Sequence, residues 1–212
     1  MKRIIGIMIF LGLFVSGYSQ ERSQPEYRTV FGRDGQTSHG GYGALTFSYA
    51  QIDGKDAFMA GFKGGWLIDH HFTFGLAGTG FVNNLQYQNI IVDNTTVSLA
   101  GGYGGFLFEP VFAPFSPVHL AFPIIMGAGG IAYVEYDPNW NNYDYYNEPK
   151  VWDANAFFIF EPGVEIELNV ARFMRIAIGT SYRLTSKLYL MNTDSYALNG
   201  FSGNLSLKFG KF

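Results

Sequence analysis

Two neighbouring segments of the sequence carry charged side chains at alternate positions, and their charges are opposite in sign. From Ala154 to Leu168 the even positions are apolar, and from Met174 to Leu184 they are mostly apolar. The odd positions hold the charges: Glu161, Glu165 and Glu167 in the first segment, Arg175 and Arg183 in the second. Successive side chains of a β-strand point to opposite faces, so each segment is predicted to be a strand with one apolar face. An antiparallel hairpin would then set an acidic row beside a basic row.

The expected turn of this hairpin determines which charges meet. A turn over Val170–Arg172 would place Glu167 opposite Arg175 and leave Arg183 diagonal to Glu161. Opposite charges that face each other across two strands attract, typically by ~0.2–1 kcal/mol. The hairpin therefore predicts at least one cross-strand ion pair.

Two charges from other segments, Glu109 and Lys63, join this predicted network. The strand pattern described below predicts a barrel of eight strands. The inside of such a barrel is just wide enough for side chains, and an unpaired charge there is costly. We therefore predict a structural network of paired charges that plugs the interior. A gated ion pathway and a carboxylate pair that performs acid–base catalysis are the alternatives.

A second candidate for chemistry is the segment Asp137–Glu148, whose spacing matches a calcium-binding loop. Oxygen ligands would come from Asp137, Asn139 and Asn141, with Glu148 as the closing carboxylate. The usual turn glycine and the flanking helices are missing, so we assign no metal ligands and leave calcium binding open. The alternative is an exposed loop whose aromatic rings contact a surface glycan or protein, and these rings are Trp140, Tyr143, Tyr145 and Tyr146.

Enzymatic chemistry finds little support elsewhere in the chain. His70 and His71 are adjacent and would point in opposite directions in a strand, and we assign no role to His39 or His119. Cysteine is absent, and there is neither a Gly-x-Ser-x-Gly motif nor a phosphate-binding loop. The formal net charge is −3 and the sequence has no run of basic residues, so no positively charged surface for binding nucleic acid is predicted. We predict no catalytic residues and no cofactor.

The alternating pattern that positions these residues recurs along the chain and predicts eight strands. They are Gly41–Ile52, Ala57–Ile68, Phe72–Val82, Thr96–Phe112, Val118–Val134, Ala154–Leu168, Met174–Leu184 and Asn199–Phe212. Short connections at 69–71, 113–117 and 169–172 alternate with long ones at 83–95, 135–152 and 185–198. Only the first loop, 53–56, breaks this rule by being short. Short turns at one end and long loops at the other are typical of outer-membrane barrels.

Two irregularities are expected in these strands. The apolar positions of Thr96–Phe112 change from odd to even, which predicts a bulge near Gly101-Gly102 or Gly104-Gly105. The repeated pairs Glu109-Pro110 and Glu161-Pro162 also predict bulges, because proline cannot donate to the ladder of a sheet.

Composition decides which face of the strands points inward. Only 15% of residues are charged and 18% are aromatic, yet the mean hydropathy is just +0.06. The polar face is rich in small residues, as a narrow interior requires, so the apolar face is predicted to contact lipid. Aromatic residues near the strand ends suggest two girdles, with Trp66, Phe72, Phe112, Phe115 and Phe173 at the short turns and Tyr49, Phe81, Tyr133 and Tyr182 at the other end. The final aromatic, Phe212, is out of phase with Phe209, so one of the two is the expected terminal aromatic residue.

The start of the chain predicts export. Met1–Ser19 has the charged start, apolar core and small-x-small end of a signal peptide, and residues 20–40 form a polar periplasmic tail. The barrel domain is then 41–212. A barrel exported in this way is expected in the outer membrane of a Gram-negative cell, with outer-membrane lipid and the barrel-assembly machinery as partners.

The mature chain resembles the small eight-stranded outer-membrane barrels of the OmpA/OmpX type, and more closely small barrel proteins of Bacteroidota. The resemblance rests on Gly40-Gly41-Tyr42-Gly43, the two Phe-Glu-Pro sequences at Phe108–Pro110 and Phe160–Pro162, and Ser181-Tyr182-Arg183. It implies an all-β, eight-stranded antiparallel up-and-down transmembrane β-barrel and an outer-membrane location, and it implies no reaction. The predicted function is a structural or surface-interaction role without catalysis. The alternatives are a small pore or transporter for small or hydrophobic solutes and a barrel hydrolase acting on lipid or peptide.

Overall fold

The computed structural model describes residues 38–83, 87–88, 96–135 and 151–212. The predicted signal peptide, most of the predicted tail, and the loop Asp137–Glu148 with its four aromatic residues lie outside this range. His39 and Gly40, which we expected in the tail, begin the first strand instead. None of the described residues forms a helix long and apolar enough to span a membrane.

All described secondary structure is β-sheet. The strands are β1 (His39–Ile52), β2 (Lys55–Ile68), β3 (Phe72–Asn83), β4 (Tyr87–Gln88), β5 (Thr96–Phe112), β6 (Val118–Ala121), β7 (Ile124–Glu135), β8 (Val151–Ala171), β9 (Met174–Thr185) and β10 (Gly200–Lys211). β6 and β7 both lie between β5 and β8 and act as one strand interrupted at Phe122-Pro123. β4 is a two-residue addition to the start of β5.

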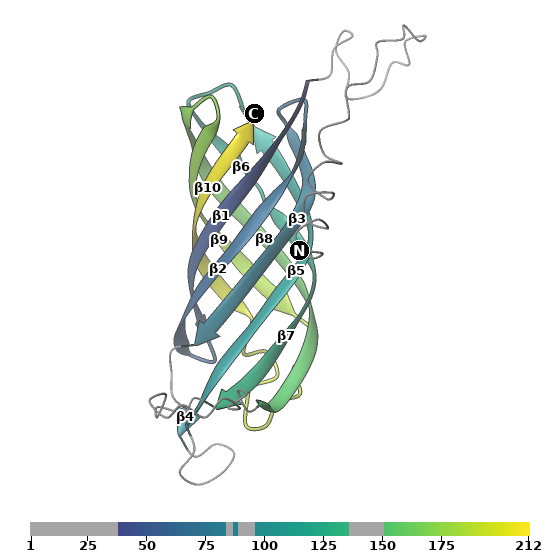
Figure 1. Cartoon of the computed structure of the whole chain (residues 1–212), viewed down its shortest axis with the longest axis vertical. Helices are drawn as coiled ribbons and strands as arrows, with labels where there is room; N and C mark the ends of the chain where they lie inside the picture. Colours follow the sequence, from purple (N-terminus) through teal and green to yellow (C-terminus); the bar gives the residue numbers. More distant parts are fainter. Residues whose placement is uncertain (1–37, 84–86, 89–95, 136–150) are drawn as a thin grey trace, which may run out of the picture. The chain divides into compact units, whose positions relative to one another are not determined.

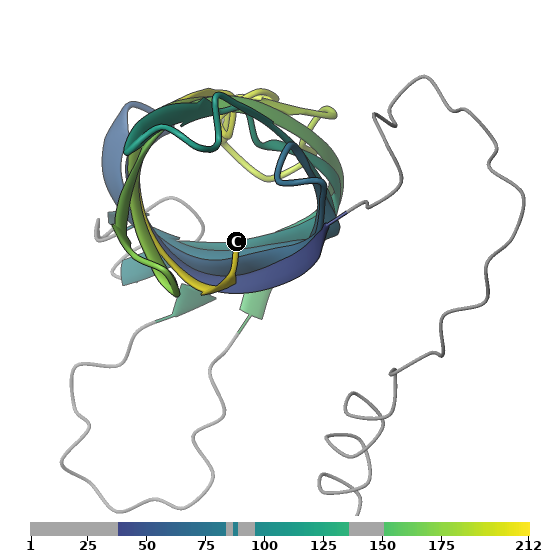
Figure 2. The same ribbon diagram turned by 90° about the horizontal axis from the view of Figure 1, so that it is seen from above.

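The strands close into a ring in which every pairing is antiparallel. β1 pairs with β2 and with the final strand β10, and the pairing of β3 with β5 joins the first half to the second. Each strand otherwise neighbours the next one along the chain, which gives up-and-down connectivity around eight positions (Figures 1 and 2). The predicted eight-stranded antiparallel up-and-down architecture is confirmed.

The apolar face of the ring points outward. Side chains such as Phe158 and Ile178 are 75% and 64% exposed, whereas the charged Glu167 and Lys208 on the opposite face are 0% and 1% exposed. A barrel in water would show the reverse arrangement, because burying apolar area is the main driving force of folding. An exposed apolar wall of this extent is instead suited to the hydrocarbon of a membrane.

The aromatic girdles are only partly as predicted. At the short-turn end Trp66, Phe112 and Phe115 are exposed on the outer face. At the loop end, however, Phe81 and Tyr133 point inward and are 5% and 0% exposed, so the girdle prediction is wrong for these two residues. The interior at this end is apolar and needs large side chains to fill it.

The predicted bulge in β5 is also wrong. The register of β5 with β3 and with β7 is continuous, so its odd positions face inward throughout. Leu99 is therefore an interior residue with 0% exposure. The apparent change of parity arises because the outward positions near the start of the strand are small, from Ser98 to Gly104, so that interior Leu99 stands out there, whereas Phe106 and Phe108 dominate further along the same regular strand.

The two Glu-Pro pairs do not form bulges either. The register is unbroken past Pro110 and Pro162, and the interruption falls in the strand between them, at Phe122-Pro123. There the Phe122 amide donates to the Pro110 carbonyl at 2.9 Å, and the Gly163 amide donates to the Pro123 carbonyl at 2.8 Å. A short break in one strand thus accommodates three prolines on adjacent strands without any extra residue.

Candidate functional site

Six charged side chains from five strands meet in the interior at the short-turn end, and we call this group the charge layer. It consists of Lys63, Glu109, Glu165, Glu167, Arg175 and Lys208. All six are 0–5% exposed. Three carboxylates face three cations, so every ionised group has a partner of opposite charge and the layer as a whole is neutral.

Lys208 is the centre of the charge layer. Its ammonium group lies 2.9 Å from the carboxylate of Glu109 and 3.2 Å from that of Glu165, and it also pairs with Glu167. Lys63 bridges two of the same carboxylates, at 2.6 Å from Glu165 and 3.2 Å from Glu109. Because each lysine joins carboxylates of different strands, the layer ties opposite walls of the ring together.

Two hydroxyl groups and one imidazole make further contacts with the layer. The Tyr42 hydroxyl donates to Glu109 at 2.7 Å, and the Ser206 hydroxyl donates to Glu165 at 3.2 Å. His119 lies inside, with Nε2 at 2.9 Å from Glu167 and Nδ1 at 3.2 Å from the Ser116 carbonyl. These contacts add further hydrogen bonds to carboxylate oxygens that each already face a cation, and such additional hydrogen bonds help to stabilise buried charges.

The C-terminal residue covers part of the charge layer. Phe212 places its ring 4.0 Å from the Arg175 guanidinium and 5.9 Å from the ring of Tyr42. Phe209, by contrast, is on the outer face and 43% exposed. The phase conflict at the end of the chain is thus resolved, because the last aromatic residue folds inward and leaves Phe209 on the membrane-facing side.

The hairpin register differs from the prediction by two residues. Arg175 is opposite Asn169, and Glu167 is opposite Ala177, because the ladder continues past an irregularity between Asn169 and Ala171 to a tighter turn. Arg175 is therefore a diagonal neighbour of Glu167, and its Nη1 atom lies 3.3 Å from Oε2 of Glu167. The predicted direct opposition of these two residues is wrong, although they do form an ion pair.

Glu161 and Arg183 lie inside but outside the charge layer. Glu161 accepts hydrogen bonds from Tyr103 at 2.7 Å and from Ser181 at 2.6 Å. Arg183, which is 1% exposed, has only neutral partners among the described residues. Its guanidinium donates to the Leu198 carbonyl at 3.0 Å and to Ser202 at 2.7 Å. The structure does not bring these two predicted network members together.

The interior at the loop end is filled by apolar side chains. Residues 186–199, which connect β9 to β10, contribute Leu188, Leu190 and Leu198 to a cluster with interior residues of the walls. The wall residues include Met59, Phe81, Leu99, Ile131, Tyr133, Phe157 and Ile159. We call this cluster the loop-end plug.

Several hydrogen bonds hold the loop in this position. The Asp53 amide in the first loop donates to the Ala197 carbonyl at 3.0 Å, and the Met191 amide donates to Asp153 at 2.9 Å. From the interior, Arg183 donates a hydrogen bond to the Leu198 carbonyl of this loop. The interior is therefore closed twice, by a charge layer at one end and by an apolar plug at the other.

Sequence reasoning missed Lys208, His119 and the loop-end plug. Lys208 shares its parity with Ser202 and Ser206 on the polar face of the last strand, a signal that places it inside. For the plug, the signal was the apolar set Leu188, Leu190 and Leu198 in a segment that we expected to be an external loop.

The charge layer leaves little reason to expect a metal. Oxygen atoms of Glu109, Glu165 and Glu167 lie within 4.8 Å of one another, a spacing that could hold an ion. The ammonium groups of Lys63 and Lys208 already supply the positive charge to these carboxylates. The residues present therefore fit a salt-bridge network better than a metal centre.

The comparisons with known proteins show the fold. No protein-family model and no curated protein matches this chain. Among solved structures it is similar to Neisserial surface protein A, with 14% identity over 84% of this chain and 100% of that one and a TM-score of 0.51. The chain folds as an eight-stranded transmembrane β-barrel. With the outward apolar wall, this agreement confirms the predicted fold class, and the resemblance to barrels of Bacteroidota stays a prediction.

Two further solved barrels show weaker likeness. The N-terminal β-barrel domain of Pseudomonas aeruginosa OprF is 7% identical over 82% of this chain and 99% of that one, with a TM-score of 0.44. Ail of Yersinia pestis, solved with the heparin analogue sucrose octasulfate, is 12% identical over 81% of this chain and 97% of that one, with a TM-score of 0.41.

Proposed function

We propose that this transmembrane barrel is a closed, non-enzymatic outer-membrane protein with a structural or surface-interaction role. The observation that carries the proposal is the double closure of the interior by the charge layer and the loop-end plug. A channel needs a continuous polar path, whereas here buried ion pairs are followed by tightly packed apolar side chains. The pore or transporter alternative is therefore less well supported than the closed barrel.

A catalytic role finds no more support. The four buried carboxylates of the described strands, Glu109, Glu161, Glu165 and Glu167, are each engaged by a cation, a hydroxyl or both, so none is placed to bind a substrate. Contact with other molecules would then fall to the loop end. The aromatic residues Trp140, Tyr143, Tyr145 and Tyr146 remain our proposed contacts for a surface glycan or protein, with barrel-assembly machinery and outer-membrane lipid as the other partners.

Conductance measurements test the closed barrel. The full chain, purified in detergent and inserted into planar lipid bilayers, should show no steady current, whereas a porin inserted in parallel shows that insertion is detected. A variant that replaces Leu188 and Leu190 by Ser loosens the plug and leaves the charge layer intact, and it should also stay closed. Steady conductance of the unmodified chain would contradict the proposal and favour the pore.

A further inference from the structure

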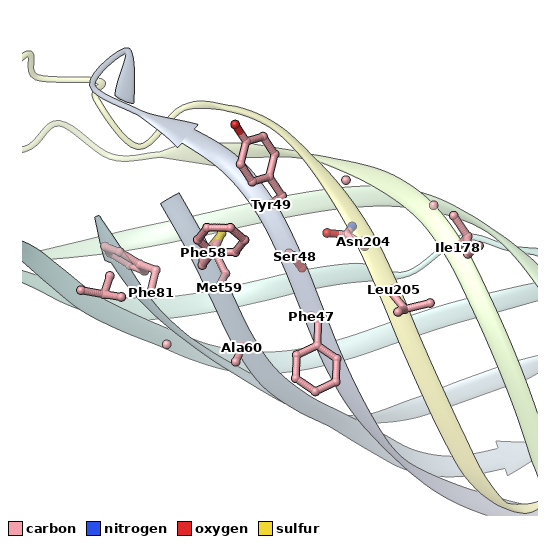
Figure 3. Close-up of a pocket in the computed structure, with 14 residues that line it drawn as sticks. Phe47, Ser48, Tyr49, Phe58, Met59, Ala60, Phe81, Ile178, Asn204 and Leu205 are labelled. Atoms are coloured by element: carbon pink, nitrogen blue, oxygen red, sulfur yellow. The ribbon is translucent and has the colours of Figure 1, made fainter. Parts of the chain in front are cut away.

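Two hollows lie next to each other on the outer surface of the barrel in its loop half. The first, the wall groove, has a volume of about 790 Å³. Figure 3 shows Phe47, Tyr49 and Phe58 around it, with Ala60 and Leu205 among the other lining residues. Its large outward-facing lining residues are exposed, from 39% for Leu205 to 64% for Ile178, whereas Met59 and Phe81, which also line it, are buried interior residues. The wall groove is therefore apolar and open toward the membrane.

The second hollow, the rim pocket, has a volume of about 690 Å³ and lies between the first loop and the connection from β9 to β10. Its polar lining includes Gln51, Thr180, Asp194 and Asn199, and Tyr196 adds an aromatic ring. Tyr49 and Gly203 line both hollows. The two hollows are thus contiguous and form one track that passes from an apolar groove to a polar pocket.

Gly203 keeps the junction of the two hollows open. It is directly opposite Tyr49 in the pairing of β1 with β10. A Cβ atom added there would meet nothing within 4 Å, whereas at Gly65 and Gly75 it would lie 2.2 and 2.0 Å from the backbone oxygen of the neighbouring strand. The close approach of strands that explains Gly65 and Gly75 therefore does not explain Gly203, whose small size leaves space on the surface.

The rim pocket has the chemistry of a cation site. The Asp194 carboxylate and the rings of Tyr49 and Tyr196 line it, and no Lys or Arg among the described residues does. The Tyr196 amide donates to Asp194 at 2.7 Å, which orients that carboxylate. Carboxylates make strong hydrogen bonds with ammonium groups, and aromatic faces attract cations. A phosphate alone would be repelled by the Asp194 carboxylate.

We propose that this track binds one membrane lipid whose headgroup carries an ammonium group. An acyl chain lies in the wall groove beside Phe47 and Phe58, and the ammonium group lies in the rim pocket near Asp194. Both volumes fall within the ~300–1,000 Å³ of small-molecule sites. Any membrane-facing groove is covered by acyl chains, so selection of the headgroup distinguishes this site from general lipid contact. The site is on the outer wall and does not depend on whether the interior conducts.

Native mass spectrometry of the full chain in mild detergent tests the proposal. The protein is offered phosphatidylethanolamine and phosphatidylglycerol with identical acyl chains, and we expect the former to be retained with about tenfold preference, the typical effect of one hydrogen bond to a charged group. Gly203→Phe should abolish the preference by filling the junction. Gly43→Phe is the matched control, because Gly43 is also outward-facing on an open surface but lines neither hollow.

A second variant keeps the test decisive if Gly203→Phe fails to fold. Asp194→Asn leaves the volume and the acceptor for the Tyr196 amide unchanged, and it should reduce the preference for phosphatidylethanolamine. Equal retention of the two lipids by the unmodified chain would overturn the proposal. So would an equal loss in Gly43→Phe and Gly203→Phe, or binding of free phosphoethanolamine as strong as that of the lipid, since the occupant would then be a soluble amine.

Discussion

Replacing Lys208 by Met is the sharpest perturbation of the charge layer. Lys208 contacts the carboxylates of Glu109, Glu165 and Glu167 and is 1% exposed. Its removal leaves three carboxylates facing two cations, so one buried negative charge loses its compensation. Breaking a buried ion pair in this way typically costs about 3–5 kcal/mol. We expect Lys208→Met to destabilise the barrel by this amount.

The second change, Glu109→Gln, should restore much of the loss. In the double variant the remaining charges are paired, because Glu165 keeps Lys63 at 2.6 Å and Glu167 keeps Arg175 at 3.3 Å. The side-chain carbonyl that Glu109→Gln introduces can still accept a hydrogen bond from Tyr42. We therefore expect the loss of unfolding free energy in the double variant to be smaller than the sum of the losses in the two single variants. The difference should be about 0.5–3 kcal/mol, the range of coupling between contacting residues.

Unfolding by urea in detergent micelles, followed by tryptophan fluorescence, measures these free energies. Lys211→Met is the control, since Lys211 belongs to the same strand but is exposed. Its loss should change stability by no more than about 0.5 kcal/mol. Additive effects of Lys208→Met and Glu109→Gln would refute the reasoning, because independent charges must each be solvated by water in an open interior.

Three further predictions concern the wall, the plug and the location of the protein. Ile178→Arg, on the lipid-facing wall, should cost about 2–4 kcal/mol near the bilayer midplane when folding into lipid vesicles is measured, and a negligible cost would mean that this face meets water. Arg183→Met should speed trypsin cleavage at the exposed Lys187 about tenfold, since the loop loses the hydrogen bond that the Leu198 carbonyl accepts from a charged group. Arg172→Met is its exposed control, and unchanged cleavage would mean that apolar packing alone holds the loop. In cells, the mature chain should begin near Gln20 and fractionate with the outer membrane, and recovery in the soluble fraction after a carbonate wash would contradict that location.

The sequence by itself determined the number of strands and their two faces. The strand period of two is a local property, so alternation such as that of Phe158, Phe160 and Ile166 against Glu161, Glu165 and Glu167 identifies a strand without knowledge of its neighbours. The low content of charge then indicated that the apolar face points outward. Both inferences needed only residues close together in the chain.

Only the tertiary structure decided which interior groups meet. Lys63 and Glu165 are 102 positions apart and come within 2.6 Å because the ring closes. The two-residue difference in the hairpin register moved Arg175 from a direct to a diagonal partner of Glu167, and alternation cannot detect it because a shift of two preserves both faces. The plug was equally hidden, since Leu188 and Leu198 lie in a segment without periodicity. A loop that folds inward is determined by the cavity that it fills, and that cavity exists only once all eight strands are in place.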